Sequence, residues 1–150
     1  MLIALVLSQT LINHPPAADQ LMGDHVFNLQ WIDSPPGVAR VSEPEKGQLQ
    51  LDAEQRNKKG DLASIKGRIT RVDAWSFELK GTITTQVSYV NSGKPCTREG
   101  DFTFRITGKR KYWRLKQMQN CDGSVDYLDI FFARPPSPAR TDIDSSSPQR

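Results

Sequence analysis

An alternation of apolar and polar residues between Trp75 and Tyr89 constrains this chain more than any other feature. Every second residue of this stretch is apolar or small, namely Trp75, Phe77, Leu79, Gly81, Ile83, Thr85, Val87 and Tyr89. The residues between them are polar or charged. A period of two places the two sets on opposite faces of a β-strand. The pattern therefore predicts a long strand with one buried face and one solvated face.

Shorter alternating runs recur along the chain, with turn-forming Gly, Pro, Asn and Asp between them. We expect about eight strands, at residues 24–32, 37–43, 48–56, 61–71, 75–90, 97–107, 110–120 and 124–132. The connections are too short for the crossovers that parallel strands need. The predicted fold class is therefore all-β, an antiparallel up-and-down meander. One apolar face on every strand favours a closed barrel, with a two-sheet β-sandwich as the alternative.

Such a short-looped, eight-strand meander with an aromatic core resembles the lipocalin-like barrels in outline. The resemblance is architectural, because the G-x-W signature is missing: Leu29 stands where a glycine would precede Trp31. No helical pattern follows the last strand either. The resemblance implies a fold that can hold a small molecule in its interior or mouth, and it transfers no functional residue.

The two ends of the chain differ in composition from its middle. The first 20 residues contain an apolar run, Leu2 to Leu7, followed by prolines and alanines, which resembles a secretory signal and is too short to span a bilayer. We expect residues 1–20 to be a signal peptide, cleaved between about Asn13 and Leu21. A buried N-terminal strand is the alternative. Residues 133–150, rich in Pro, Ser and Asp, predict a disordered tail, so the barrel domain should span residues 23–132.

The two cysteines are predicted to form a disulfide. A two-residue turn at Gly108-Lys109 places Phe104 opposite Trp113, and the same register places Cys96 opposite Cys121. An even cysteine count in an apparently secreted chain fits this bond. A second tight turn, at Asp122-Gly123, would put Leu115 opposite Ile130 and keep one apolar face across three strands. We therefore expect an extracytoplasmic protein, periplasmic or secreted, with no membrane span.

The most basic stretch of the chain, GKRKYWRL at residues 108–115, divides between the two faces of its strand. Trp113 and Leu115 should point inward. The expected outward set, with its neighbours, is Arg105, Arg110, Tyr112, Arg114 and Lys116. These residues could bind an anion or nucleic acid, but a solvated strand face is favoured, since Glu99 and Asp101 lie nearby. The totals of 20 Lys+Arg and 17 Asp+Glu add no strong basic field, so no specific nucleic-acid partner is expected.

Six residues are candidates for contacting a ligand inside the barrel or at its mouth: Trp31, Trp75, Thr85, Lys111, Trp113 and Gln117. Tryptophans more often fill a barrel than line a pocket. Lys111, on the inward face near a turn, either neutralises an anionic head group or extends its amine past the rim. Inward glycines at positions 67, 81 and 100 mark sharp bends, the favoured interpretation, or floor space for a bound molecule.

Catalytic and metal chemistry lack suitable residues in this sequence. His14 and His25 are the only histidines, which leaves neither a catalytic triad nor a multi-His metal site. We expect His25 to be exposed at the start of its strand. The acidic group around Asp122, Asp126 and Asp129 lacks the spacing of a calcium loop. The chain is therefore predicted not to be an enzyme and to need no metal or cofactor.

The leading hypothesis is a small extracytoplasmic β-barrel protein that binds a small, mostly apolar ligand in its interior or mouth. The alternative is a secreted interaction or structural module with a filled core and no small-molecule ligand. Interior volume separates the two: a cavity of roughly several hundred Å³ favours the first. A core filled by aromatic side chains favours the second. The sequence leaves the ligand's identity and the oligomeric state open.

Overall fold

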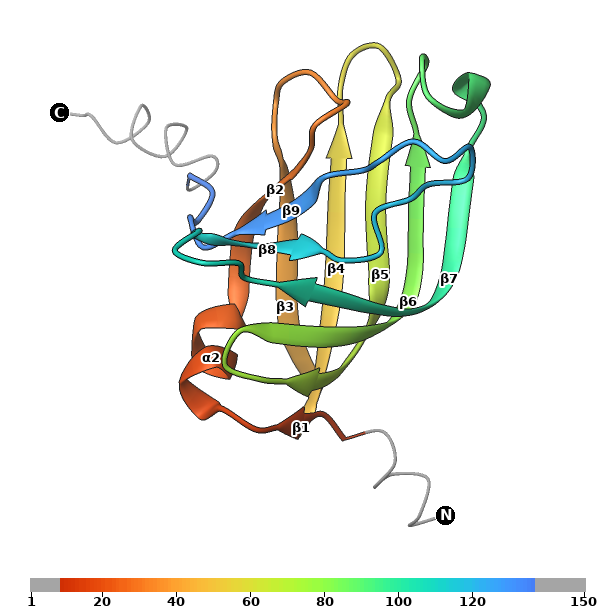
Figure 1. Ribbon diagram of the computed structural model, residues 1–150. Helices are drawn as coiled ribbons and strands as arrows, with labels where there is room; N and C mark the ends of the chain where they lie inside the picture. Colours follow the sequence, from red (N-terminus) through yellow and green to blue (C-terminus); the bar gives the residue numbers. More distant parts are fainter. Residues whose placement is uncertain (1–8, 137–150) are drawn as a thin grey trace, which may run out of the picture.

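The computed structural model describes residues 9–136. Eight antiparallel strands follow one another around a closed barrel, and a short strand and a helix precede them (Figure 1). The barrel strands are β2 (Gly23–Leu29), β3 (Gly37–Glu45), β4 (Gln48–Arg56), β5 (Leu62–Val72), β6 (Ser76–Gln86), β7 (Cys96–Arg105), β8 (Tyr112–Leu115) and β9 (Leu128–Phe131). The preceding elements are β1 (Leu11–Ile12) and α2 (Pro15–Leu21), and a 3-10 turn, η1 (Asn91–Gly93), lies between β6 and β7.

Each barrel strand pairs with its neighbours in sequence, and β9 pairs with β2 to close the barrel. The closing register places Phe27 opposite Ile130. The predicted up-and-down barrel is therefore confirmed. The one departure from antiparallel pairing is β1, which runs parallel to the end of β5, with Leu11 beside Arg71.

Alternation produces the core as expected. Along β6, Phe77, Leu79 and Ile83 are buried while the residues between them are not. The rings of Phe77 and Phe104 stack at 5.0 Å, and Trp113 meets Phe77 edge-on at 6.0 Å. Aromatic and aliphatic side chains thus fill the barrel interior at this level.

The three inward glycines form a single row across β5, β6 and β7. Gly67 lies opposite Gly81, and Gly81 lies opposite Gly100. A Cβ atom on Gly81 would lie 2.2 Å from the carbonyl oxygen of Lys66. At Gly67 and Gly81 the backbones therefore approach too closely for a side chain, which supports the interpretation as a bend, whereas Gly100 is exposed and a Cβ atom there would have no heavy atom within 4 Å. Figure 1 shows β6 crossing the lower end of the barrel before it turns upward.

The register of the β7–β8 hairpin differs by two residues from the prediction. The turn forms where expected, with Arg110 N donating to Thr107 O at 3.2 Å. However, Ile106 N donates to Trp75 O across to the β5–β6 turn, so the β7–β8 ladder includes Phe104 opposite Leu115 rather than opposite Trp113. Because an even shift keeps every side chain on its face, Trp113 and Leu115 are still buried.

The β8–β9 register is shifted by two residues as well. Trp113, rather than Leu115, lies opposite Ile130. The physical reason is the length of β8, which contains four residues only. The chain leaves the ladder after Leu115 and loops toward β9, so the turn at Asp122-Gly123 does not set the pairing of β8. The two predicted registers were therefore wrong, while the predicted inward faces of Trp113, Leu115 and Ile130 were right.

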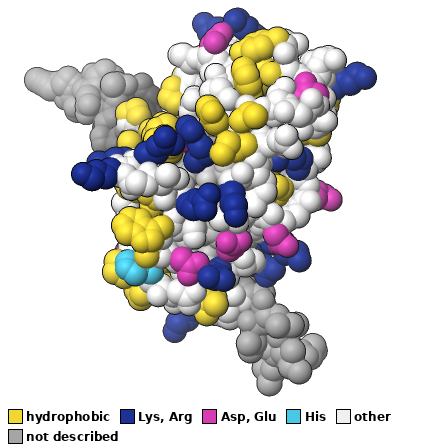
Figure 2. Space-filling view, in the orientation of Figure 1, with side chains coloured by type: hydrophobic (Ala, Val, Ile, Leu, Met, Phe, Trp, Pro, Cys, Tyr) yellow, Lys and Arg dark blue, Asp and Glu magenta, His cyan; other side chains and the backbone are white. Residues whose placement is uncertain are grey.

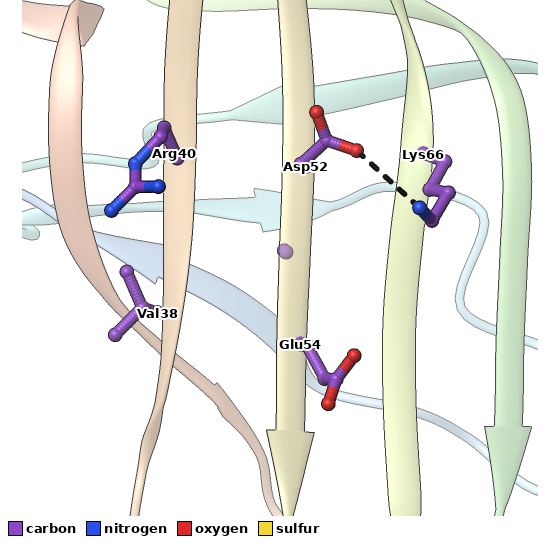
Figure 3. A pocket seen from close by; sticks show the side chains of 6 residues that line it. Val38, Arg40, Asp52, Glu54 and Lys66 are labelled. Carbon is purple, nitrogen blue, oxygen red and sulfur yellow. Dashed lines mark ion pairs between the residues drawn. The ribbon is translucent and has the colours of Figure 1, made fainter.

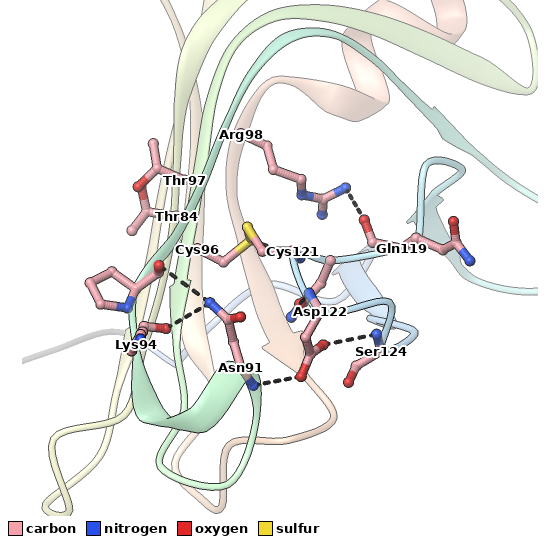
Figure 4. The surroundings of a disulfide bond; sticks show 12 residues. Thr84, Asn91, Lys94, Cys96, Thr97, Arg98, Gln119, Cys121, Asp122 and Ser124 are labelled. Atoms are coloured by element: carbon pink, nitrogen blue, oxygen red, sulfur yellow. Dashed lines mark hydrogen bonds between the residues drawn. A yellow bond between two sulfur atoms is a disulfide. The ribbon is translucent and has the colours of Figure 1, made fainter.

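The predicted disulfide is confirmed. Cys96 and Cys121 are bonded, with their Cα atoms 5.7 Å apart (Figure 4). The bond joins the start of β7 to the long β8–β9 connection. Beside it, Asn91 N donates to a carboxylate oxygen of Asp122 at 2.8 Å, so the β6–β7 and β8–β9 connections are held together twice.

The described part of the N-terminal segment, residues 9–21, packs onto the barrel. His14 caps α2 by accepting from Ala17 N, and two prolines begin the helix. Leu21 is buried, and the Thr10 hydroxyl donates to Ile69 O and accepts from Leu49 N. Much of the predicted signal segment is therefore part of this fold. Residues 1–8 lie outside the described residues, and cleavage remains a prediction.

The first residues of the predicted tail also contact the barrel. One guanidinium nitrogen of Arg134 donates to the carbonyl oxygens of Met22 and Asp24, at 2.8 and 3.0 Å. Residues 137–150, which make up most of the predicted disordered tail, lie outside the described residues. Between residues 9 and 136, no helix has the length and hydropathy needed to cross a membrane.

Candidate functional site

The six predicted ligand-contacting residues do not share one pocket. Trp113 and Thr85 are buried in the packed interior. Trp113 contacts the rings of His25 and Phe132 at 5.5 and 4.7 Å. Thr85 lies opposite Cys96, near the other end of the barrel. Both side chains are therefore core positions in this structure.

The predicted inward orientation is wrong for Trp75 and Gln117. Trp75 is 66% exposed, because it lies in the β5–β6 turn, where Asp73 N donates to Ser76 O, and strand alternation does not govern turn residues. Gln117 is exposed because it follows the end of β8. Its side-chain oxygen accepts a hydrogen bond from Thr103 N at 2.9 Å. Gln117 therefore supports the β7 backbone from outside.

Trp31 takes part in a polar cluster at the end of the barrel that carries the disulfide. Its indole N–H donates to Asp126 at 3.0 Å, and Asp126 is 1% exposed. Burial raises the pKa of Asp126, opposed by the Trp31 hydrogen bond and the charge of Arg98. Arg98 Nη2 lies 3.8 Å from the second carboxylate oxygen, and these two buried atoms have no hydrogen-bond partner in the described structure. This cluster fills the interior there and leaves Trp31 half-buried.

Arg98 and Asp126 were not identified as interior residues from the sequence. The alternation that places Cys96 and Phe102 inside also places Arg98 on the inward face of β7, so a signal existed for the arginine. Asp126 has the parity of the buried Leu128 and Ile130 within the strand expected at residues 124–132, so a signal existed for it too, although β9 itself begins at Leu128. Among residues 9–136, no group of three or more His, Cys, Asp or Glu side chains could hold a metal ion.

Trp75 and Lys111 do meet, in a hollow of about 410 Å³ at the opposite end of the barrel. We call this hollow the Trp75 groove; its lining is Gln20, Ala74, Trp75, Ile106, Gly108, Lys109, Arg110, Lys111 and Phe132. Four separate parts of the chain form it: the end of α2, the β5–β6 turn, the β7–β8 turn, and Phe132, which follows β9. The lining combines apolar rings and an isoleucine with three consecutive cations. Lys109 was expected only to turn the chain, and Arg110 to face solvent as part of the outward set that could bind an anion.

Backbone hydrogen bonds hold the walls of the Trp75 groove in place. Ile106 N donates to Trp75 O at 2.8 Å, which joins the two turns. Phe132 N donates to Lys111 O at 2.9 Å, which joins the end of β9 to the β7–β8 turn. Phe132 also packs on the buried Trp113. The groove therefore rests on the core rather than on free loops.

A second hollow, of about 280 Å³, lies beside the first along the β7–β8 hairpin. We call it the Arg105 hollow; its lining is Arg105, Thr107, Arg110, Arg114, Leu115, Lys116, Met118 and Tyr127. Arg110 belongs to both linings. Arg114 makes two hydrogen bonds to Asp129, at 2.7 and 2.8 Å, and its guanidinium lies 4.1 Å from the centre of the Tyr127 ring.

Six cations line these two hollows, and Asp129 neutralises only one of them, Arg114. Neither lining contains Asp or Glu. Within the described structure, five of the six cations have no carboxylate oxygen within 4.0 Å: Arg105, Lys109, Arg110, Lys111 and Lys116. Figure 2 shows Lys and Arg side chains clustered on this side of the barrel next to hydrophobic ones.

Another hollow, on the outer face of β3 to β5, has the opposite character (Figure 3). There Lys66 pairs with Asp52 at 3.9 Å, and Glu54 lies beside them. Arg40 makes an ion pair with Asp24 at 2.7 Å. Charges on that face offset one another, whereas the linings of the two hollows beside the β7–β8 hairpin contain cations and no carboxylate.

His25 lies directly behind the Trp75 groove and is fully buried, so the expectation that it is exposed was wrong. Its two ring nitrogens lie 2.8 Å from the carbonyl oxygens of Leu21 and Phe131, the neighbours of Gln20 and Phe132. Burial lowers the pKa of His25. The side chain is enclosed because α2, which the strand pattern did not predict, covers the start of β2.

The part of the chain that matches a known family includes every residue that lines the two hollows. The PM1083 family matches residues 9–132 of the chain. A protein of Pasteurella multocida (strain Pm70), named "Uncharacterized protein PM1083", is 47% identical over 116 residues, which cover 76% of this chain and 74% of that protein. No solved structure gives a significant match.

Proposed function

This chain belongs to the PM1083 family, and we propose that it is a small extracytoplasmic β-barrel protein that binds an anionic amphiphile at one end of the barrel. One observation carries the proposal: the Trp75 groove places an exposed indole beside three cations that no described carboxylate neutralises. The apolar part of the ligand would lie on Trp75, Ile106 and Phe132. Its anionic group would lie near the Lys109–Lys111 segment.

The size and lining of the groove support a ligand at the barrel end rather than inside. Its volume, about 410 Å³, falls in the usual range for small-molecule sites. The interior at the level of Phe77, Phe104 and Trp113 is filled with packed rings. The opposite end is occupied by the Trp31–Asp126 cluster. An interior ligand would have to displace these contacts.

The exposed indole gives the second line of support. Moving a tryptophan side chain out of water releases roughly several kcal/mol of free energy, in proportion to its apolar area. An exposed tryptophan such as Trp75 has not yet contributed this free energy. A ligand chain laid against Trp75 would recover part of this free energy. Lys111 would then act as the neutralising cation, one of the two roles that its position suggested.

The extracytoplasmic location is supported by two features. The Cys96–Cys121 disulfide suits an oxidising compartment, where such bonds persist. The apolar run from Leu2 to Leu7 resembles a secretory signal.

The packed aromatic core also favours a second candidate, an interaction module with no small-molecule ligand. In that case the same basic and aromatic surface would contact an anionic macromolecule. The two candidates differ in whether a monomeric amphiphile saturates the site on its own.

The test is isothermal titration calorimetry with decyl phosphate below its micelle concentration, against decan-1-ol as the uncharged ligand. We expect saturable one-to-one binding of decyl phosphate and much weaker binding of decanol. Octyl phosphate should bind about tenfold more weakly, since each buried methylene contributes roughly 0.8 kcal/mol. Trp75→Ala should weaken decyl phosphate binding by about tenfold or more.

Tyr89→Ala is the matched control, because Tyr89 is an equally exposed aromatic at the other end of the barrel. It should leave binding unchanged. Binding that Trp75→Ala does not weaken, or no binding of any alkyl phosphate, would reject the ligand-binding proposal and leave the interaction module.

A further inference from the structure

We propose that the Arg105 hollow binds a phosphate-type dianion, and that this dianion is a second anionic group of the ligand held in the Trp75 groove. The ligand class is then an alkyl diphosphate or a similar amphiphile with two adjacent phosphate-type groups. The inference rests on the proposed function, because it assigns the second group to the same molecule.

Uncompensated charge at the Arg105 hollow is the first argument. Arg105 on β7 lies directly opposite Arg114 on β8. Like charges opposite each other in a ladder destabilise a sheet. Asp129 neutralises Arg114 with two hydrogen bonds, whereas Arg105 has no carboxylate partner in the described structure. The repulsion is therefore only partly relieved by the protein itself.

The arrangement of the cations is the second argument. Arg105, Arg110 and Lys116 come from a strand, a turn and the residue after β8, and all three line the same hollow. Arginine guanidinium groups donate paired, parallel N–H bonds that match phosphate oxygens. A phosphate monoester carries nearly two negative charges at neutral pH, and so offsets this cluster better than a carboxylate does.

Arg114 makes the hollow rigid without competing for the ligand. Its guanidinium is bonded to Asp129 and lies over the rings of Tyr112 and Tyr127, at 5.1 and 4.1 Å. Asp129 already neutralises its charge, and contacts with Asp129, Tyr112 and Tyr127 hold its side chain in place. The free cations therefore surround a preformed wall, which lowers the entropic cost of binding.

Arg110 connects the two hollows, because its side chain lines both of them. Arg110 can therefore contact an anionic group near Lys109 to Lys111 and one in the Arg105 hollow. Two adjacent phosphates of one ligand fit this arrangement. Two independent ligands would place their charges next to each other without a covalent link to offset the repulsion.

The experiment compares decyl phosphate, decyl diphosphate and inorganic pyrophosphate by calorimetry at low ionic strength. We expect decyl diphosphate to bind wild-type protein about tenfold or more tightly than decyl phosphate, since paired charges add bonds at the second hollow. In Arg105→Gln/Lys116→Gln this advantage should fall to about twofold or less, with decyl phosphate affinity unchanged. Added salt should reduce the advantage, because exposed charges are screened.

The control removes the same charge elsewhere. Arg68→Gln/Lys80→Gln changes two cations that face each other on the outside of β5 and β6, and it should keep the full advantage of the diphosphate. Thermal midpoints of both double variants close to the wild-type midpoint would show that folding is unaffected. The advantage surviving in Arg105→Gln/Lys116→Gln would overturn the inference.

The two failures can be told apart. If decyl phosphate binds and depends on Trp75 but the second phosphate adds nothing, the proposed function stands and this inference is wrong. If pyrophosphate alone binds as tightly as decyl diphosphate, the hollow takes a free anion and the shared-ligand assignment is wrong. If Trp75→Ala leaves alkyl phosphate binding unchanged, the proposed function itself fails.

Discussion

His25 has both ring nitrogens 2.8 Å from backbone carbonyl oxygens. A neutral imidazole has a single N–H, so it can donate to only one of them. Arg134 Nη1 lies 3.2 Å from Nε2 and can donate to it when that nitrogen is unprotonated. Burial is the main cause that lowers the pKa of His25, and the charge of Arg134 adds to the effect, while the two carbonyls and Asp24 oppose it. The fold therefore accommodates the neutral ring.

The lowered pKa makes stability depend on pH. Because the unfolded chain binds the proton more readily than the folded one, the contribution is complete above the usual histidine pKa of about 6.5 and is lost as pH falls below it. We expect the free energy of unfolding, measured by urea denaturation, to decrease between pH 7.5 and 5, by at most about 1.4 kcal/mol per pH unit from this group. His25→Gln should show a smaller decrease over the same interval.

Asp24 does not contribute to this pH dependence. Its hydrogen bond to Arg40 lowers its pKa from 3.8, so it titrates below the interval from pH 7.5 to 5. An unchanged pH slope in the His25→Gln protein would mean that the acid sensitivity arises from another group.

At the scale of elements, the connections at the disulfide end are organised by side chains rather than by strand pairing. β8 ends at Leu115, and the chain up to Leu128 includes one isolated bridge, between Gln119 and Val125. Arg98 donates to the carbonyl oxygen of Gln117 at 2.7 Å and to that of Gln119 at 3.0 Å, and Figure 4 shows the second of these bonds. The Cys96–Cys121 disulfide and the Asn91–Asp122 hydrogen bond attach the turn of the β8–β9 connection to the start of β7 and to the β6–β7 connection.

Replacing both cysteines with serine should therefore lower the free energy of unfolding by about 2–4 kcal/mol. The bonded residues are 25 positions apart, and the β7–β8 hairpin already restricts this loop in the folded state. Urea denaturation of Cys96→Ser/Cys121→Ser against the oxidised wild type measures the difference. Thiol titration of unfolded, unreduced wild-type protein should detect no free thiol; two reactive thiols would contradict the bond.

At the scale of the whole molecule, the segment before the barrel completes one end of it. Leu21 and Ala17 are buried against the core, and Thr10 bridges β4 and β5 through its hydroxyl. Gln20 lines the Trp75 groove, and the Leu21 carbonyl contacts His25. The fold and the candidate site therefore share this segment.

A chain that begins at Met22 should consequently be less stable than one that begins at Gln9. We expect a loss of about 3 kcal/mol or more, the usual cost of removing one large buried side chain, seen as a lower urea midpoint. Equal midpoints would show that the segment is dispensable. N-terminal sequencing of protein from its own host then tests the predicted cleavage between Asn13 and Leu21.

Much of this fold could be predicted from sequence because strand alternation is a local property. Within β6 the period of two assigns inward and outward faces whatever the neighbouring strand does, although Trp75 and Tyr89, which lie beyond the ends of β6, are exposed. An even register shift kept those faces, so Trp113 and Leu115 were placed correctly although their partners were not. The disulfide prediction was also correct, although the hairpin register used to pair the two cysteines was wrong by two residues. Closure into a barrel followed from one apolar face on every strand.

The candidate site could be identified only from the tertiary structure. Many of its residues lie in turns, where strand alternation does not predict which side chains are buried. Trp75 belongs to a turn, and its exposure depends on how that turn bonds to Ile106. His25 is buried because a helix covers it. Arg105, Lys111 and Lys116 are unpaired in the described structure because no carboxylate lies within 4.0 Å of them after folding. The amino-acid composition does not contain such distances. By itself the sequence determined the strands, their faces and the cysteine pair, since these are local or pairwise; only long-range packing brought together the groove that we propose binds the ligand.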